Sequence, residues 1–213
     1  DLFAKGVELL AAGADGLAVA TDAAVYGGQV GDLVTIGRRL KTAGLAEDRP
    51  ALVRQDFVVH PIQLAEAAEA GADAVMLVAG VCLPDLEELM NSATLMGLEV
   101  VVECSSPLEM EFAMEAGATL LCLSNLDRAT NTYVAGRAAA LRREVPEWIT
   151  TIASGGVVTA SDAWTLSDAG FDAVLMGGSL MRSPRPDRLI GEIRSRKRDM
   201  DQRFFGSVGY AAE

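Results

Sequence analysis

Two short glycine turns in the second half of the chain carry residue types that could bind a ligand. Ser154-Gly155-Gly156 follows a β-branched apolar run, and Gly177-Gly178-Ser179 follows a second apolar run. Glycine has no side chain, so the backbone N–H groups of such turns remain accessible to an anion. We predict a phosphate site formed by both turns. The alternative is that the glycines only allow the chain to turn tightly.

A different unit recurs along the chain: a helix stops at glycine, a short helix-to-strand turn follows, and a buried strand begins. The four copies of this helix-to-strand turn are Ala12-Gly13-Ala14-Asp15, Ala70-Gly71-Ala72-Asp73, Ala116-Gly117-Ala118-Thr119 and Ala169-Gly170-Phe171-Asp172. The apolar runs are nearly continuous, which is typical of parallel strands covered by helices. Strands are predicted near residues 16–20, 51–55, 73–78, 99–103, 119–124, 149–153 and 172–176.

Helices are expected between these strands. They are predicted over residues 2–12, 61–70, 85–96, 107–116 and 131–144, with a further helix opened by Ser161-Asp162 and a last one starting near Pro186-Asp187. This alternation predicts an α/β fold. The repeated unit and the paired glycine turns favour a TIM (β/α)8 barrel over an open doubly wound sheet.

The predicted barrel is one strand short of eight. Because the chain opens on a helix, we predict that the first strand is absent from the sequence. An unfilled place would expose two strand edges, so either that strand lies outside this sequence or another segment takes its place. The barrel is assigned to residues 1–198 and a C-terminal tail to residues 199–213.

The composition argues against some partners and sites. The net charge of −12 argues against binding to nucleic acid or anionic membrane, and no apolar run approaches the roughly 20 residues of a membrane span. Cys82, Cys104 and Cys122 lack metal-ligand spacing, so we expect buried, reduced thiols and no metal site. These features are expected of a soluble protein in a reducing compartment, either the cytoplasm or an organelle stroma or matrix.

Longer segments of the chain form a more specific pattern. They are Ala18-Val19-Ala20-Thr21-Asp22, Tyr26-Gly27-Gly28, Val53-Arg54-Gln55-Asp56-Phe57-Val58-Val59, Val101-Val102-Glu103, Ala153-Ser154-Gly155-Gly156 and Met176-Gly177-Gly178-Ser179-Leu180-Met181-Arg182-Ser183-Pro184. In order and spacing they resemble the indole-3-glycerol-phosphate synthase family of tryptophan biosynthesis. The resemblance implies a barrel enzyme that closes an indole ring on an anthranilate-derived sugar phosphate, with loss of carbon dioxide and water and without a cofactor.

The resemblance also implies site residues, several of which differ here. The family's general-acid lysine after the third barrel strand corresponds to Gln55, and an amide cannot deliver a proton as an ammonium does. Glu103 corresponds to the catalytic carboxylate and Tyr26 to an aromatic residue of the substrate pocket. The family's asparagine corresponds to Ser124, although Asn125 is adjacent, and its Glu-Ser-Gly corresponds to Ser154-Gly155-Gly156. Alternatively, Glu103 is an inherited group without a catalytic role and Tyr26 only covers the barrel mouth.

Other polar residues are expected to have structural roles. Arg54 and Asp56 are predicted to pair around their strand. His60 precedes Pro61 at a helix start, where a role at the helix N-terminus or in solvent is favoured over catalysis.

No lysine replaces the missing general acid. Lys5, Lys41 and Lys197 are all predicted away from the carboxyl ends of the strands, where barrel enzymes carry out their chemistry. We therefore hypothesise a non-catalytic barrel that is a binding or structural subunit of a larger assembly and retains a site for a sugar phosphate. The alternative is an active indole-3-glycerol-phosphate synthase or a related sugar-phosphate lyase.

The end of the chain goes beyond what a barrel requires. The basic run Arg194-Ser195-Arg196-Lys197-Arg198 is followed by Phe204-Phe205-Gly206-Ser207-Val208-Gly209-Tyr210. Exposed aromatic residues among glycines would be an apolar liability in water. We hypothesise that this segment contacts a protein partner; the alternative is that it folds back onto the barrel.

Overall fold

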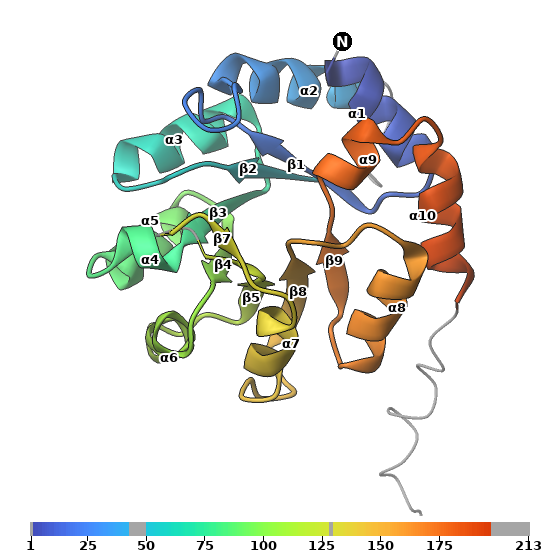
Figure 1. Ribbon diagram of the computed structural model, residues 1–213. Helices are drawn as coiled ribbons and strands as arrows, with labels where there is room; N and C mark the ends of the chain where they lie inside the picture. Colours follow the sequence, from blue (N-terminus) through green and yellow to red (C-terminus); the bar gives the residue numbers. More distant parts are fainter. Residues whose placement is uncertain (1, 43–49, 128–129, 197–213) are drawn as a thin grey trace, which may run out of the picture.

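The computed structural model describes residues 2–42, 50–127 and 130–196 (Figure 1). Seven parallel strands form one sheet in the order β1-β2-β3-β4-β5-β8-β9. They are β1 (Gly16–Ala20), β2 (Ala51–Gln55), β3 (Ala74–Val78), β4 (Glu99–Cys104), β5 (Leu120–Ser124), β8 (Thr150–Ser154) and β9 (Ala173–Leu175). The sheet curls and the helices surround it (Figure 1). This confirms the prediction of a barrel rather than an open sheet with helices on both faces.

Helices connect successive strands. They are α1 (Leu2–Ala11), α2 (Val30–Thr42), α3 (Pro61–Ala70), α4 (Ala79–Cys82), α5 (Leu86–Leu95), α6 (Pro107–Glu115), α7 (Arg137–Arg142), α8 (Ala160–Asp168), α9 (Gly178–Arg182) and α10 (Pro186–Ser195). A short antiparallel pair, β6 (Leu126–Asp127) and β7 (Thr132–Tyr133), follows β5. We call these two paired strands the β6–β7 hairpin.

The barrel has two strand edges within the described residues. There β1 pairs only with β2, and β9 pairs only with β8. An eighth strand would close the ring between them, and the described part of the chain supplies none. This agrees with the prediction that the first strand is absent from the sequence.

The repeated turn has a physical cause that the structure makes plain. Gly71 follows α3 with a φ of 88°, a left-handed conformation that glycine adopts without steric cost. The carboxylate of Asp73 then accepts a hydrogen bond of 2.8 Å from the backbone N–H of Leu52. Asp172 accepts one of the same length from Thr151. In these two copies the turn therefore ends the helix and attaches the new strand to its neighbour.

The strands bury apolar side chains on both faces. Residues packed between sheet and helices include Leu77, Val102, Leu121 and Phe171, and residues packed inside the barrel include Met76, Val101 and Cys122. Burial on both faces explains why the strands read as continuous apolar runs.

The three cysteines are free and buried, as predicted. Burial raises the pKa of the Cys82 thiol to about 11 and also raises the pKa of Cys104. Both thiols therefore stay protonated at neutral pH, which suits packing rather than nucleophilic chemistry.

The helix predicted over residues 131–144 is wrong at its start. Asn131 has a φ of 52°, and Thr132 and Tyr133 form β7 instead. The helix begins only at Arg137, after Gly136 with a φ of 81°. A left-handed residue at each of these two points prevents the helix from extending toward β5.

The predicted cap of α8 also needs correction. The N-cap is Thr159, whose hydroxyl accepts a hydrogen bond from the Asp162 N–H. The Asp162 carboxylate accepts one in return from the Thr159 N–H, which completes a reciprocal capping box. These bonds, with one from Val158, lower the pKa of Asp162. Ser161-Asp162 thus lies inside the helix and does not open it.

Candidate active site

The strand ends bring four polar side chains to one end of the barrel interior. Val53, Val101, Cys122 and Ile152 belong to the apolar cluster inside the barrel. Side chains alternate along a strand, so the residues two positions later share the inward direction. These are Gln55, Glu103, Ser124 and Ser154, at the carboxyl ends of β2, β4, β5 and β8. The structure therefore brings together these four positions at the face where barrel chemistry occurs.

Glu103 lines a small cavity at this end. Its side chain is buried, and the cavity, of about 140 Å³, is lined by Phe57, Val78, Gly80, Val81, Glu103, Ser105 and Glu109. The Glu109 carboxylate accepts a hydrogen bond of 2.6 Å from the backbone N–H of Ser105. Glu103 is thus in a pocket with apolar walls and a second carboxylate, where it could accept a proton from a bound substrate.

Gln55 provides an amide where the resemblance places an ammonium group. Its side chain is partly buried at the end of β2. No lysine within the described residues takes over the role, because Lys5 belongs to α1 and Lys41 to α2. Lys197 lies outside the described residues. Among the described residues, the barrel end therefore has a carboxylate in Glu103 but no lysine to act as its acid partner.

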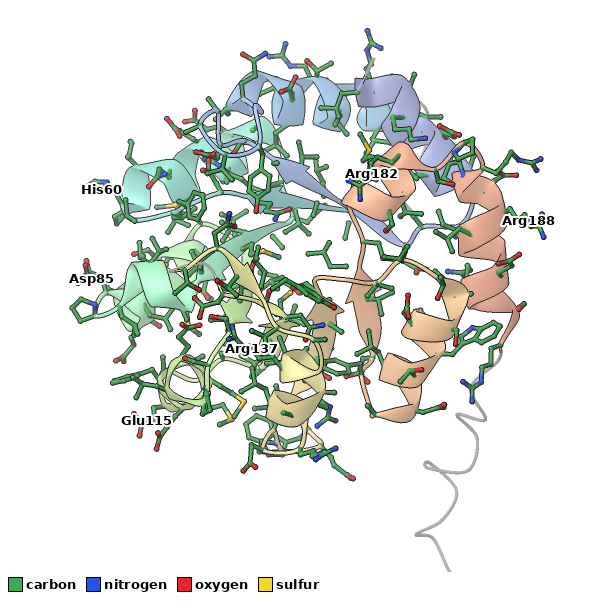
Figure 2. All side chains as sticks on the ribbon, viewed as in Figure 1. His60, Asp85, Glu115, Arg137, Arg182 and Arg188 are labelled. Carbon is green, nitrogen blue, oxygen red and sulfur yellow. The ribbon has the colours of Figure 1, made fainter. Side chains whose placement is uncertain are left out.

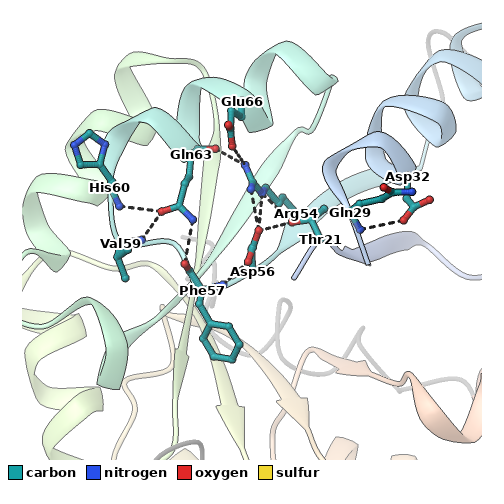
Figure 3. Close-up of polar contacts among 10 residues, drawn as sticks. All are labelled: Thr21, Gln29, Asp32, Arg54, Asp56, Phe57, Val59, His60, Gln63 and Glu66. Atoms are coloured by element: carbon teal, nitrogen blue, oxygen red, sulfur yellow. Dashed lines mark hydrogen bonds and ion pairs between the residues drawn. The ribbon is translucent and has the colours of Figure 1, made fainter. Parts of the chain in front are cut away.

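The cation next to Gln55 is directed elsewhere. Arg54 is buried and points toward α3, where it binds the Asp56 carboxylate at 2.8 Å and the Gln63 carbonyl at 2.6 Å (Figure 3). The Thr21 hydroxyl donates to the same carboxylate at 2.5 Å. The predicted Arg54–Asp56 pair is confirmed as a structural pair that joins β1, β2 and α3.

This network also sets the acidity of Asp56. Burial alone would raise its pKa, but hydrogen bonds from Thr21, Arg54 and the Phe57 N–H outweigh burial and lower the pKa. Asp56 therefore stays ionised and holds the Arg54 guanidinium away from the barrel mouth.

His60 is a helix cap. Its Nδ1 accepts a hydrogen bond of 3.1 Å from the Ile62 N–H, and Gln63 completes the capping box (Figure 3). The side chain lies at the periphery of the molecule (Figure 2). The predicted role at a helix start is confirmed.

The two glycine turns are adjacent. Gly155 and Gly156 have φ values of 81° and 83°, which favour glycine. The Ser179 hydroxyl donates to the Val157 carbonyl at 2.8 Å and so connects the second turn to the first. The backbone N–H groups of Gly155, Gly156 and Gly177 donate to no other group within the described residues. These N–H groups lie at the turns where the sequence predicts an anion, and that prediction stays a prediction.

A cation accompanies the second turn. A Cβ placed on Gly178 would lie 2.8 Å from Nη1 of Arg182, so the guanidinium lies directly against the glycine. Figure 2 shows Arg182 on α9. A phosphate at the turns would therefore meet backbone donors and a positive charge.

Tyr26 lies apart from the cavity. It belongs to the loop between β1 and α2, is 43% exposed and does not line the Glu103 cavity. The following Gly28 passes so close to the Ala20 carbonyl that a Cβ would overlap with it. Gly27-Gly28 therefore allow this loop to fold against the end of β1.

One residue of the site, Tyr133, was missed from the sequence, and Asn125 was noted only as the neighbour of Ser124. Tyr133 covers Gly156, and Asn125 binds the Gly155 carbonyl through its side chain at 2.9 Å. Tyr133 had been assigned to a helix. The β-branched and aromatic run Thr132-Tyr133-Val134, followed by Gly136, is the signal that could have placed a strand there and the helix start later.

Two kinds of feature are absent from the described residues. These residues contain no cluster of three or more His, Cys, Asp or Glu residues arranged to hold a metal ion. None of their helices is long and apolar enough to cross a membrane. The Phe204–Tyr210 segment lies outside the described residues.

Comparison of folds agrees with the barrel architecture. Thiamine phosphate pyrophosphorylase from Pyrococcus furiosus matches with a TM-score of 0.69 at 18% identity, over 92% of this chain and 88% of that one. 3-Hexulose-6-phosphate synthase also matches with a TM-score of 0.69, at 13% identity over 91% of each chain. At such identities the likeness shows the fold alone.

Sequence comparison identifies the family. The family model for indole-3-glycerol phosphate synthase matches residues 3–193. The synthase of Opitutus terrae is 34% identical over 87% of this chain and 69% of its own length. That of Methanothermobacter marburgensis is 33% identical over 88% of this chain and 65% of its own length. The chain therefore belongs to the indole-3-glycerol phosphate synthase family.

Proposed function

We propose that this family member binds a sugar phosphate at its two glycine turns but does not close the indole ring. The observation that carries the proposal is Gln55 at the end of β2, where the family resemblance implies a general-acid lysine. A positioned general acid contributes about 10²- to 10⁴-fold to a rate. The side-chain amide of Gln55 has no proton of suitable acidity to give to a departing hydroxyl.

Two further positions support the loss of catalysis. Ser124 stands where the family resemblance implies asparagine, and Ser154-Gly155 stands where it implies Glu-Ser. Both positions lie at the barrel end that also contains Glu103. Replacement at three separate strand ends is expected where ring closure is no longer under selection.

The two glycine turns still present groups that can bind a phosphate. Three backbone N–H groups, of Gly155, Gly156 and Gly177, have no partner within the described residues, and Arg182 lies against Gly178. Phosphate binds well where backbone N–H groups and a guanidinium converge. We infer a binding or structural subunit of a larger assembly, regulated or stabilised by a sugar phosphate.

The second candidate function is the synthase activity itself. It is favoured by family membership and by Glu103, which remains buried at the end of β4 beside a cavity. In this case another group would have to supply the proton that the lysine delivers.

Incubation with the anthranilate-derived sugar phosphate separates the two candidates. We expect calorimetry to detect binding and chromatography to recover the ligand unchanged. The Gln55→Lys variant should also leave the ligand unchanged, because Ser124 and Ser154-Gly155 still differ from the family pattern. Conversion to indole-3-glycerol phosphate by the natural chain would favour the second candidate.

A further inference from the structure

Tyr133 lies directly on the first glycine turn. A Cβ placed on Gly156 would overlap with the Tyr133 hydroxyl and with two carbons of its ring. The phenol therefore takes the space beside Gly156 that a side chain would need, and its hydroxyl lies at the turn itself. About half of the Tyr133 side chain remains exposed to solvent. A ligand arriving at the turn would thus meet this hydroxyl.

Asn125 fixes the position of the β6–β7 hairpin relative to the turn. Its side-chain amide donates to the Gly155 carbonyl at 2.9 Å and accepts from the Ala138 N–H at 2.9 Å. Its backbone N–H donates to the Ser154 carbonyl, and its carbonyl accepts from the Val134 N–H. Asn125 is 7% exposed, so water competes little for these bonds. The residue after Tyr133 is therefore held to the same asparagine that holds the turn.

The hairpin is also braced from the other side. Arg137, at the start of α7, forms an ion pair of 3.4 Å with Asp127, the hairpin residue that pairs with Thr132. In contrast, the Tyr133 hydroxyl forms no hydrogen bond within the part of the chain that the structure describes. The Tyr133 hydroxyl is therefore a rigidly placed hydrogen-bond donor without an acceptor among the described residues. It lies beside the first glycine turn, where the backbone N–H groups of Gly155 and Gly156 likewise have no acceptor among those residues.

We propose that Tyr133 is a ligand-contacting residue of the phosphate site, with its hydroxyl donating to an oxygen of a phosphate monoester held at the glycine turns. This assignment rests on the proposed phosphate binding and adds a side chain that the family resemblance does not supply. The β6–β7 hairpin forms one wall of the site, and the length of Tyr133 sets how closely the phosphate approaches Gly156.

Titration calorimetry with inorganic phosphate and with glycerol 3-phosphate, at constant ionic strength, tests the assignment. The Tyr133→Phe variant keeps the ring against Gly156 and removes only the hydroxyl. Because a hydrogen bond to a charged group is stronger than a neutral one, we expect its loss to weaken both affinities about ten- to a hundredfold. The thermal midpoint of the variant should match that of the natural chain.

Thr132→Val is the matched control. It removes a hydroxyl from the adjacent position of the same hairpin, where Thr132 donates to the Thr130 carbonyl. Its phosphate affinity should equal that of the natural chain. Unchanged or tighter binding by Tyr133→Phe would overturn the Tyr133 assignment while leaving the glycine turns as the site. Failure of the natural chain to bind either probe would overturn both the phosphate site and the assignment.

Discussion

At the scale of single residues, the chemistry of the site depends on which side chains point into the carboxyl end of the barrel. Arg54 and Gln55 are adjacent, yet only Gln55 shares the inward direction of Val53. The one cation on β2 is turned outward and bound to Asp56. A substitution of Gln55 therefore changes the mouth, whereas a substitution of Arg54 changes the packing of α3.

The fit of Tyr133 against Gly156 gives a prediction for glycine replacement. Gly156→Ala should destabilise the protein for two reasons, the φ of 83° and the overlap of the new Cβ with Tyr133. We expect a cost above the roughly 1 kcal/mol typical of alanine in a left-handed conformation. Chemical denaturation of the variant measures the free energy of unfolding.

Gly117→Ala is the control for that measurement. Gly117 has a similar φ of 86°, but nothing lies within 4 Å of where its Cβ would be. Replacing Gly117 with alanine should lower the free energy of unfolding only by the cost of placing alanine in a left-handed backbone conformation. In a Tyr133→Ala background, Gly156→Ala should approach the cost of Gly117→Ala. Equal costs for the two glycines in the natural background would argue against the Tyr133 contact.

The lowered pKa of Asp56 gives a pH prediction. A carboxyl whose pKa is lower in the folded state stabilises the protein above its unfolded pKa of about 3.9, and this contribution is lost as the pH falls through the folded pKa. Asp56→Asn should cost about 3 kcal/mol at pH 7, because it leaves Arg54 with a buried, weakened partner. The difference from the natural chain should shrink below about pH 4.

Glu66→Gln is the matched control for Asp56. Glu66 contacts the same guanidinium at 3.3 Å, but its side chain is 48% exposed. Its loss should cost no more than about 1 kcal/mol. If Asp56→Asn unfolds no more easily than Glu66→Gln at pH 7, the network does not stabilise the fold as described.

At the scale of elements, the strands were predictable and the β6–β7 hairpin was not. Each predicted strand agrees with an observed strand to within one residue at either end. The strands could be predicted because burial on both faces of the sheet makes each strand a continuous apolar run in the sequence. The hairpin has only two residues in each strand, and it depends on the left-handed Asn131 and on the contact of Tyr133 with Gly156, a residue that becomes its neighbour only through the fold.

The start of α8 offers a test at this scale. Thr159 caps the helix by accepting from the Asp162 N–H at 3.2 Å. Thr159→Ala should cost about 1 kcal/mol in the free energy of unfolding, measured by denaturation. Ser161→Ala, at the residue that the sequence alone suggested as a cap, should cost close to nothing. The reverse order of costs would show that the helix begins at Ser161.

At the scale of the whole molecule, the sequence predicts the barrel and its missing strand but only part of the site. The glycine turns were found because glycine pairs after strands carry a local signal. Tyr133 was missed because its contact with Gly156 joins segments separated by a helix and a strand. The direction of Arg54 likewise depends on α3, through the Gln63 carbonyl. Such contacts are set by packing across elements and leave no local pattern.

The central claim is that this barrel does not catalyse ring closure, and the rate of product formation tests it most directly. The full-length protein and the Opitutus terrae relative would be assayed side by side for formation of indole-3-glycerol phosphate from the anthranilate-derived sugar phosphate. Loss of the general acid predicts a rate at least about 10²-fold below that of the relative. A rate comparable to that of the relative would contradict the claim and identify the protein as an active synthase.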